Sequence, residues 1–342
     1  MKKYRIILVV LCIGAAMAIP QFAFANPLPT PPGELFLETI LPPILLAILQ
    51  GIAEFLPISS SGHLVLLNSL FHEDMGMFFD LVLHLATLVS VVLYYRRDIA
   101  EIFVGCIREL GSGSKEPTEP TEPAEPTEPT EPAEPSRDPS PSSEPAPAPA
   151  KREKKYWKFV GCLAVATAIT GVIGLLLNDW VEHELRSAVL VGSLLIVNAG
   201  ILWISRKKGL FSMTDGALTL KTSIFLGLAQ GLAVLPGISR SGTTITVALL
   251  LGIAQQDCAK ISFLLSIPVI LGAVVLHLKD FAQISTNGMG SFIIAAVIAA
   301  IVGYVSLVVL NRMLKKAKFH YFAPYCLIVG LIAVVCGLLG DK

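Results

Sequence analysis

The sequence predicts an all-α polytopic membrane protein with an inverted-topology repeat, in which each half is a re-entrant helical hairpin plus three transmembrane helices. Of the 342 residues, 54% are hydrophobic and only 15% are charged, whereas soluble domains average about 25% charged residues. A chain this apolar can bury its surface only in lipid, where helices satisfy the backbone polar groups. The second observation is an internal repeat with a constant offset, described below.

Six apolar segments are long enough to cross a hydrocarbon layer of about 30 Å at about 1.5 Å per residue. They are residues 78–95, 157–177, 187–204, 261–278, 291–310 and 321–339. Four other apolar segments are too short, namely residues 44–56, 62–70, 223–235 and 243–254. These form two pairs, each broken by a turn rich in Pro, Gly and Ser, which is typical of re-entrant hairpins that line a cavity.

Two segments are expected outside the membrane body. Residues 1–25 resemble a signal peptide or an uncleaved signal anchor, because basic residues precede an apolar stretch and an Ala-Phe-Ala site. Residues 111–155 contain seven Glu-Pro pairs within residues 116–135 and are predicted to form a disordered, extended linker. The predicted organisation is a first repeat divided between residues 36–110 and 156–206, and a second repeat over residues 217–340.

The formal net charge of zero conceals a basic membrane body. Residues 116–144 hold nine acidic residues and one basic residue, which leaves 25 basic and 17 acidic residues elsewhere, a net charge of +8. Such a body suits anionic lipid headgroups or an anionic substrate.

The positions of the basic residues also predict an orientation. If the chain after residue 30 starts outside and each long segment crosses the membrane, almost all basic loop residues fall on the inner side. After the first hairpin, the outer loops keep only Arg186, Lys279 and Lys342. This positive-inside pattern predicts a multi-pass protein with the linker on the cytoplasmic side and the first hairpin open to the outer side of the membrane.

The internal repeat relates residues 50–63 (QGIAEFLPISSSGH) to residues 230–243 (QGLAVLPGISRSGT). The offset is 180 residues without a gap, and seven of the fourteen positions are identical. Three long segments separate the copies, and this odd number reverses the second copy relative to the first. One hairpin is therefore expected to enter from each side of the membrane, with the two turns meeting near its midplane.

Each turn carries small polar residues that lead into a short helix. Hydroxyl groups, backbone N–H groups and helix N-termini then converge, which favours an anion. Arginine adds a planar fork of donors suited to phosphate oxygens. The candidate residues of the two turns are Ser59, Ser60, Ser61 and Gly62 in the first copy, and Ser239, Arg240, Ser241 and Gly242 in the second.

The first copy also supplies titratable groups. Gln50 and Glu54 lie four residues apart on one helical face that leads to the turn. His63 follows the serine turn, so a carboxylate, an imidazole and the guanidinium of Arg240 are all available for phosphoryl transfer. Either His63 or a serine could attack phosphorus. Asp80, with His84 four residues later, is a further candidate ligand for a divalent cation.

These motifs resemble the two signatures of the bacterial undecaprenyl-pyrophosphate phosphatase family, the bacitracin-resistance type. EFLPISSSGH is similar to the first signature and PGISRSGTT to the second. The resemblance implies hydrolysis of undecaprenyl pyrophosphate to the monophosphate carrier used for peptidoglycan, with a divalent cation, Mg²⁺ or Ca²⁺. It also implies a multi-pass protein of the bacterial plasma membrane whose site opens to the periplasmic side. Position 50 departs from the family pattern, because Gln50 stands where many members have Glu.

By motif, the resemblance implies two groups of site residues. The catalytic group is Glu54, Ser60, His63 and Arg240, with Glu54 also a metal ligand. The substrate-binding group is Gln50, Ser59, Ser239, Ser241 and Thr244, to which the chemistry of the turns adds Ser61, Gly62 and Gly242.

Two other functions compete with the phosphatase hypothesis. Inverted repeats with re-entrant turns are also typical of transporters, here for a phosphorylated lipid or anion. A membrane scaffold that docks partners through the Glu-Pro linker is the third hypothesis. The expected partners are undecaprenyl pyrophosphate and the bilayer, not nucleic acid, and the sequence specifies no oligomeric state.

The orientation can be tested by cysteine labelling in a variant that lacks the six native cysteines. A membrane-impermeant maleimide should label Ser142→Cys, in the linker, only after the cells are permeabilised. It should label Asp179→Cys in intact cells, because residues 178–184 are expected to form an outer loop. Labelling of Ser142→Cys in intact cells would contradict the inverted arrangement.

Overall fold

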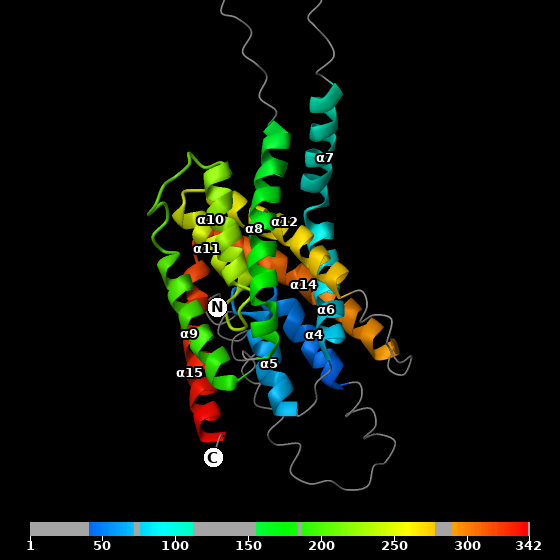
Figure 1. Cartoon of the computed structure of the whole chain (residues 1–342), viewed down its shortest axis with the longest axis vertical. Coiled ribbons are helices and arrows are strands. Elements are labelled where there is room, and N and C mark those ends of the chain that lie inside the picture. The colour runs from blue at the N-terminus through cyan, green and yellow to red at the C-terminus, as the bar shows by residue number, and fades with distance from the viewer. Residues whose placement is uncertain (1–40, 72–75, 112–154, 184–186, 278–288, 341–342) are drawn as a thin grey trace, which may run out of the picture.

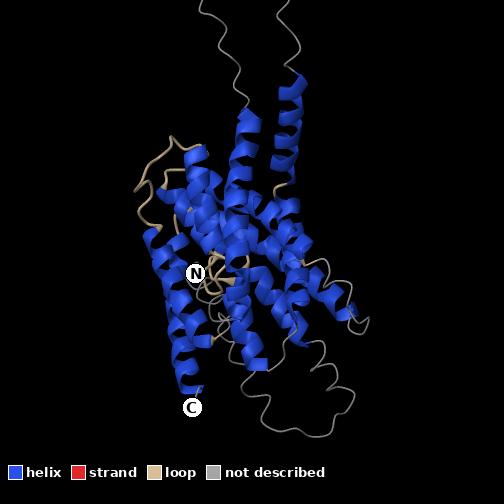
Figure 2. Cartoon of the chain, viewed as in Figure 1, coloured by secondary structure: helices blue, strands red, loops and turns tan. Residues whose placement is uncertain are grey.

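The computed structural model describes residues 41–71, 76–111, 155–183, 187–277 and 289–340. These residues form helices and connecting loops, and no strand occurs among them (Figure 2). The predicted signal-like segment and almost all of the predicted linker lie outside the described residues. The first half contributes α4 (Leu41–Ala53), α5 (Ser60–Phe71), α6 (Gly76–Tyr94), α7 (Arg96–Gly111), α8 (Lys155–His183) and α9 (Ala188–Ile204).

The second half contributes the same kinds of element. Two short helices come first, followed by long apolar ones. They are α10 (Leu220–Leu232), α11 (Arg240–Leu250), α12 (Gln255–Leu276), α14 (Met289–Lys315), the short 3₁₀ helix η2 (Phe319–Phe322) and α15 (Ala323–Gly340).

Four helical stretches in the described part of the chain are long and apolar enough to cross a bilayer. They are Lys155–Leu177, Gln255–Leu276, Gly290–Lys315 and Phe319–Leu339. A fifth crossing is formed if α6 and α7, which meet at a bend of 70°, count as one broken span. The predicted all-helical, multi-pass membrane class is therefore confirmed.

Two of the six predicted spans differ in detail. The segment at residues 187–204 forms α9, a 17-residue apolar helix. The segment at residues 78–95 forms most of α6, and the chain then continues into α7, which the sequence analysis did not predict. The helix breaks at Tyr95, directly before Arg96, whose guanidinium donates to the Leu93 carbonyl at 3.1 Å.

Helix α7 pairs with the start of α8 and projects with it from one end of the molecule (Figure 1). The Glu109 carboxylate accepts hydrogen bonds from the backbone N–H groups of Tyr156 and Trp157 at 3.0 and 3.2 Å. Because the first N–H groups of a helix have no partner within it, Glu109 acts as a cap supplied by the neighbouring helix.

The two short helices that precede the turns pack in the same way on opposite halves. Helix α4 packs on α14, and a Cβ at Gly51 would lie 2.8 Å from the Ala299 carbonyl oxygen. Helix α10 packs on α8, and a Cβ at Gly231 would lie 2.6 Å from the Ile173 side chain. Gly51 and Gly231 are equivalent positions of the sequence repeat, so each copy uses the same glycine for close helix contact.

Helices α9 and α15 run side by side and join the two halves (Figure 1). Their closest approach is at Gly192 and Gly330. A Cβ on either glycine would lie 2.7 Å from the carbonyl oxygen of the other. Small residues allow such backbone contact between membrane helices, where packing rather than hydrophobic burial drives association.

We expect Gly330→Ala to lower the apparent melting temperature of the purified protein, because backbone atoms of α9 cannot move aside for the added methyl group. The cost should be about 1–3 kcal/mol. Gly200→Ala is the matched control on α9, where a Cβ meets nothing within 4 Å. It should leave the melting temperature unchanged or raise it, since alanine favours helix by about 1 kcal/mol over glycine. Equal effects of the two substitutions would contradict this account of the α9–α15 contact.

Candidate active site

The two turns of the internal repeat touch each other. A Cβ on Gly62 would lie 2.9 Å from the Gly237 Cα, and a Cβ on Gly242 would lie 3.1 Å from the Pro57 Cβ. These contacts are reciprocal, because Gly62 corresponds to Gly242 and Pro57 to Gly237 in the repeat. The hydroxyl of Ser59 also accepts a hydrogen bond from the Gly237 N–H at 3.1 Å.

Serine hydroxyls organise each turn in the same manner. The Ser59 hydroxyl accepts from the Gly62 N–H at 3.3 Å, and the Ser239 hydroxyl accepts from the Gly242 N–H at 3.1 Å. Both are helix N-caps, which satisfy N–H groups at the starts of α5 and α11. Ser59 has a φ of 70°, a left-handed conformation that is costly for a residue with a side chain and that often occurs at functional sites.

Asn198 of α9 connects the two turns. Its amide donates to the Pro57 carbonyl at 3.2 Å, and its Oδ1 accepts from the Ser239 N–H at 3.1 Å. The side chain is fully buried. A buried amide that bonds to backbone on both sides fixes the separation of the turns.

Glu54 is the centre of the polar cluster beside these turns. Its Oε2 accepts hydrogen bonds from the Gln50 amide at 3.1 Å and from the Ser60 hydroxyl at 2.7 Å. Its Oε1 forms an ion pair with Arg240 Nη2. Glu54 itself is buried, and His84 Nε2 lies 3.6 Å from Oε2. The cluster therefore joins a carboxylate from the first copy to a guanidinium from the second.

Ser60 lies next to the Glu54 carboxylate. It is the first residue of α5, is only half-buried, and its hydroxyl donates to a carboxylate at a short distance. A hydroxyl in this position can lose its proton to the neighbouring base as it attacks an electrophile. The positive end of α5 favours negative charge at the same place.

Arg240 keeps donor capacity beyond its contact with Glu54. It is the first residue of α11, and its Nη1 is buried without a hydrogen-bond partner in the described structure. A buried, unsatisfied guanidinium nitrogen is costly unless an anion fills the space. This geometry suits a forked contact to phosphate oxygens.

His63 is not brought to the Glu54 cluster by any hydrogen bond. It is fully buried, its Nδ1 lies 2.8 Å from the Ser59 carbonyl oxygen, and its Nε2 lies 2.9 Å from the Tyr325 hydroxyl. The two rings are stacked, with an interplanar angle of 6°. Both ring nitrogens are thus used to hold the strained Ser59 turn against α15, and direct catalysis by His63 stays a prediction.

The remaining predicted binding residues lie at half-buried or buried positions. Ser61 is half-buried beside Ser59, with 3.5 Å between the hydroxyl oxygens, and the equivalent distance from Ser241 to Ser239 is 3.3 Å. Thr244 is fully buried, and its hydroxyl donates to the Arg240 carbonyl at 2.8 Å. Thr244 therefore supports the first turn of α11 and the backbone of Arg240.

The oxygen donors near Glu54 fit a hard divalent cation that is completed by substrate. No group of three or more His, Cys, Asp or Glu residues lies close enough for a metal within the described ranges. However, Gln50 Oε1 is buried without a partner there, beside the Glu54 carboxylate. Mg²⁺ commonly binds one or two protein oxygens together with substrate phosphates and water. On α6, His84 Nδ1 lies 2.7 Å from the backbone carbonyl oxygen of Asp80, and His84 Nε2 lies 3.6 Å from Glu54 Oε2. His84 therefore places the Asp80–His84 segment near this cluster.

Comparison with known proteins accords with the geometry. Residues 43–332 match the family model of the bacitracin resistance protein BacA. The chain belongs to the BacA family. It is 35% identical to the undecaprenyl-diphosphatase of Methanosphaera stadtmanae over 88% of this chain and 99% of that protein. It is 36% identical to the undecaprenyl-diphosphatase of Alcanivorax borkumensis over 84% of this chain and 95% of that protein.

In this BacA family member, sequence analysis missed two residues that contact the turns and gave a third residue, His84, another role. Tyr325 and Asn198 lie in apolar segments far along the chain from the turns they contact. His84 was predicted only as a companion of the candidate cation ligand Asp80; in the structure its Nδ1 faces the Asp80 carbonyl oxygen at 2.7 Å and its Nε2 lies 3.6 Å from Glu54 Oε2. The only local signal was a polar residue within an apolar stretch, which marks an internal position in a membrane helix.

We expect Asn198→Leu to destabilise this BacA family member by several kcal/mol, because the Ser239 N–H and the Pro57 carbonyl each lose a buried partner at about 1–3 kcal/mol. Thermal unfolding of the purified protein measures the effect. Thr167→Val is the control, since Thr167 of α8 is half-buried and its hydroxyl donates to its own helix at 2.8 Å. A loss for Asn198→Leu no larger than for the control would contradict the bridging role.

Proposed function

We propose that the protein hydrolyses undecaprenyl pyrophosphate to undecaprenyl phosphate and inorganic phosphate, which returns the lipid carrier to peptidoglycan and cell-wall polymer synthesis and confers resistance to bacitracin. The observation that carries this proposal is the cluster of Ser60, Glu54 and Arg240 where the two turns meet. It combines a nucleophile, a base and a phosphate-binding cation. The family membership and the names of the relatives support the same reaction.

In the proposed first step, Ser60 Oγ attacks the terminal phosphorus of the pyrophosphate. The Oγ–P bond forms as the bond from that phosphorus to the bridging oxygen breaks, and undecaprenyl phosphate leaves with the bridging oxygen. The proton of Ser60 passes to Glu54 Oε2, with which it is already hydrogen-bonded at 2.7 Å. No other proton transfer is needed, because a phosphate monoester is a good leaving group as an anion.

In the second step, water attacks the phosphoserine. A new O–P bond forms, the P–Oγ bond breaks, and Ser60 Oγ takes back the proton held by Glu54. Inorganic phosphate leaves with the protons of the water molecule. The same carboxylate therefore serves as base in one step and as acid in the next, as general acid–base catalysis requires.

Arg240 is proposed to bind the non-bridging oxygens of the terminal phosphate through its unpartnered Nη1 and the nitrogen that now contacts Glu54. The helix N-termini of α5 and α11 and the hydroxyls of Ser61 and Ser241 complete the anion site. Charge developed in the transition state is then met by fixed donors in a site of low dielectric constant, where their effect is large.

His63 is proposed to position the reacting serine rather than to attack phosphorus itself. Both of its ring nitrogens are engaged, and its contact to the Ser59 carbonyl lies one residue before the nucleophile. A divalent cation, Mg²⁺ or Ca²⁺, is proposed to bind Glu54 and the Gln50 amide oxygen, with Asp80 a further candidate ligand. When bound, the cation would neutralise phosphate charge.

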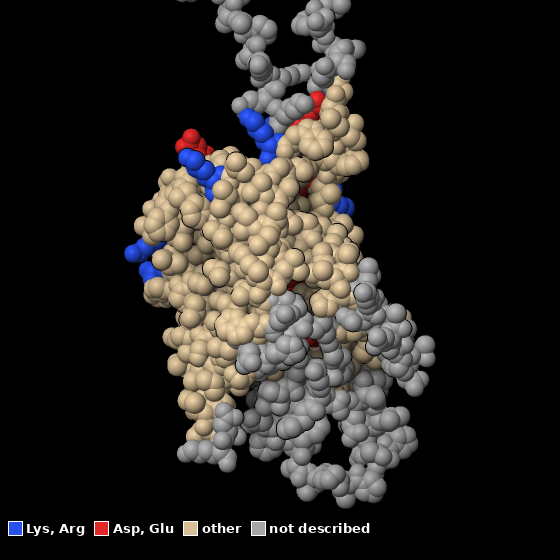
Figure 3. All heavy atoms as spheres, in the orientation of Figure 1, with Lys and Arg blue, Asp and Glu red and all other residues tan. Residues whose placement is uncertain are grey.

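We also propose that the halves are inverted repeats with re-entrant hairpins, and that the site opens to the periplasmic side with the linker cytoplasmic. Three observations support a twofold relation: the reciprocal contacts of the turns, the use of the equivalent Gly51 and Gly231 for close helix packing, and the mutual contact of Gly192 with Gly330. On the face seen in Figure 3, the Lys and Arg residues of the described chain gather toward the end where α7 and α8 project, which supports a cytoplasmic assignment for that end.

The chemistry can be tested by single-turnover phosphate release from undecaprenyl pyrophosphate by purified protein. Ser60→Ala and Glu54→Gln should each lower the rate by about 10²–10⁴ or more, because each removes a reacting group. Both should bind a non-hydrolysable prenyl pyrophosphate analogue within about tenfold of wild type, since Arg240 and the helix N-termini remain. Chelator should slow wild-type release if the cation takes part.

Ser193→Ala is a matched control, because Ser193 is exposed and donates only to its own helix at 2.7 Å. It should release phosphate at the wild-type rate. A fast Ser60→Ala variant with a dead His63→Ala variant would reverse the proposed roles of these residues. Wild-type protein that releases no phosphate but moves the lipid across a vesicle bilayer would replace the phosphatase with the transporter.

A further inference from the structure

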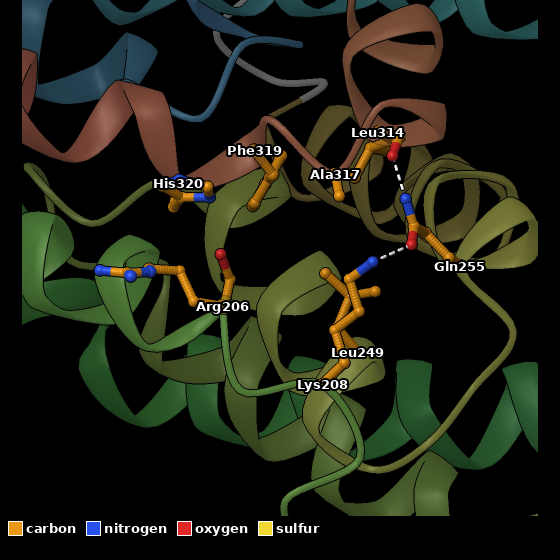
Figure 4. Close-up of a pocket in the computed structure, with 9 residues that line it drawn as sticks. Arg206, Lys208, Leu249, Gln255, Leu314, Ala317, Phe319 and His320 are labelled. Carbon is orange, nitrogen blue, oxygen red and sulfur yellow. Dashed lines mark hydrogen bonds between the residues drawn. The ribbon is translucent and has the colours of Figure 1, made fainter.

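A cavity lies away from the turns, where the ends of several helices meet. It has a volume of about 210 Å³. Leu249, which contributes to its wall, lies nine residues after Arg240 along α11, a distance of about 14 Å at about 1.5 Å per residue. The cavity is lined by Ser205, Arg206, Lys208, Leu249, Gln255, Leu314, Ala317, Phe319 and His320 (Figure 4).

The charged groups of this cavity are basic. In Figure 4, Arg206 and His320 lie on one side and Lys208 on the other, with Phe319 between them. No acidic residue lines the cavity. Among the described residues, the ion pairs involve Glu54, Asp98 and Asp257, and none includes a cation of this cavity.

The partners of Lys208 are neutral. Its ammonium group donates to the Gln255 Oε1, and the Gln255 amide donates in turn to the Leu314 carbonyl. The nearby Asp257 is paired with Lys260 at 3.1 Å and does not line the cavity. The positive charge of Lys208 is therefore held in place by hydrogen bonds without being neutralised, which attracts an anion.

Aromatic residues beside the cavity indicate that it lies at the membrane–water boundary. Arg206 stacks over the exposed Trp203 ring at 4.6 Å, and Lys318 lies 5.9 Å from the centre of the exposed Tyr321 ring. Tryptophan and tyrosine collect at the level of lipid headgroups, where basic residues meet lipid phosphates. The buried Leu249, Leu314 and Phe319 give the same cavity an apolar wall.

We infer that this cavity binds a phosphate-bearing anion on the proposed cytoplasmic side, separate from the catalytic site. Arg206 and Lys208 hold the phosphate from two sides, and the apolar wall receives the carbon skeleton attached to it. A phosphate with an attached carbon chain at this depth is the headgroup of an anionic phospholipid, and free phosphate offers the same charge without the apolar part. Basic cavities between helix ends are typical sites for anionic headgroups. The inference rests on the proposed orientation but not on the phosphatase reaction.

The test uses the full-length protein in lipid nanodiscs that contain equal amounts of phosphatidylcholine and phosphatidylglycerol. After mild delipidation in detergent, mass spectrometry measures how much of each lipid stays bound. Wild type should retain phosphatidylglycerol in preference to phosphatidylcholine. In the variant Arg206→Ala/Lys208→Ala, the ratio of retained phosphatidylglycerol to retained phosphatidylcholine should fall about tenfold, because each basic residue near the surface contributes substantially to anionic lipid binding.

The control variant is Lys315→Ala/Lys316→Ala, which removes two exposed charges from the end of α14 and the residue after it without changing the lining of the cavity. It should keep the wild-type preference. Equal retention by wild type and Arg206→Ala/Lys208→Ala, or equal loss in both variants, would overturn the inference. Millimolar inorganic phosphate should leave the lipid bound if the headgroup is the ligand. If phosphate displaces the lipid from wild type but has no such effect on the Arg206→Ala/Lys208→Ala variant, the result would support the anion site and assign it to free phosphate.

Both variants should release phosphate from detergent-solubilised undecaprenyl pyrophosphate at the wild-type rate, because neither changes a group in the catalytic cluster. Failure of the phosphatase proposal would show as wild-type protein without activity, whatever the lipid measurement gives. Failure of the lipid inference would show as unchanged retention in protein that is active. The two results are therefore independent.

Discussion

The ion pair between Glu54 and Arg240 links the two halves of the molecule inside its membrane body. An isolated charge at this depth is costly, and removing either residue would leave the charge of the other buried without a partner. The pair is therefore stable only if the turn that carries Glu54 and the helix that begins at Arg240 meet in one arrangement. Gly62 and Gly242 allow that approach because they have no side chains, and a Cβ on either would crowd Gly237 or Pro57 of the opposite turn.

The same interaction explains how a stable core can also be a reactive one. In the proposed mechanism, a pyrophosphate brings more negative charge than the single carboxylate that Arg240 contacts, so the substrate would compete with Glu54 for the guanidinium. With Arg240 turned to phosphate, Glu54 would keep its hydrogen bonds from Ser60 and Gln50 and could take the Ser60 proton. Binding of the substrate and activation of the nucleophile would then be two consequences of opening one ion pair.

The sequence predicted the parts of this site that are local, and it missed those that depend on packing between distant segments. The repeat at an offset of 180 residues identified both turns, since N-capping serines and glycines are specified by a few neighbouring residues. The partners of His63 and Ser239 could not be predicted in this way. Tyr325 and Asn198 lie 262 and 41 residues away from them, and nothing in an apolar helix marks which polar residue faces which turn. Helix α7 was missed for a related reason. Its start depends on the break at Tyr95 and its position depends on contacts with α8, whereas its apolar residues taken alone look like a continuation of the preceding span.

The two copies of the repeat share the same kind of turn, but they carry different chemical groups at equivalent positions. Gln50 and Gln230 are identical, but Gln230 donates to Thr170 at 3.3 Å, whereas Gln50 donates to Glu54. The position equivalent to Glu54 is Val234, and the position equivalent to Ser60 is Arg240. A symmetric pair of acidic turns would place two carboxylates together and repel a pyrophosphate, while two arginine turns would bind it without a base. Under the proposed twofold relation, divergence at these positions would turn one duplicated anion-binding turn into a single candidate site with an acidic side and a basic side.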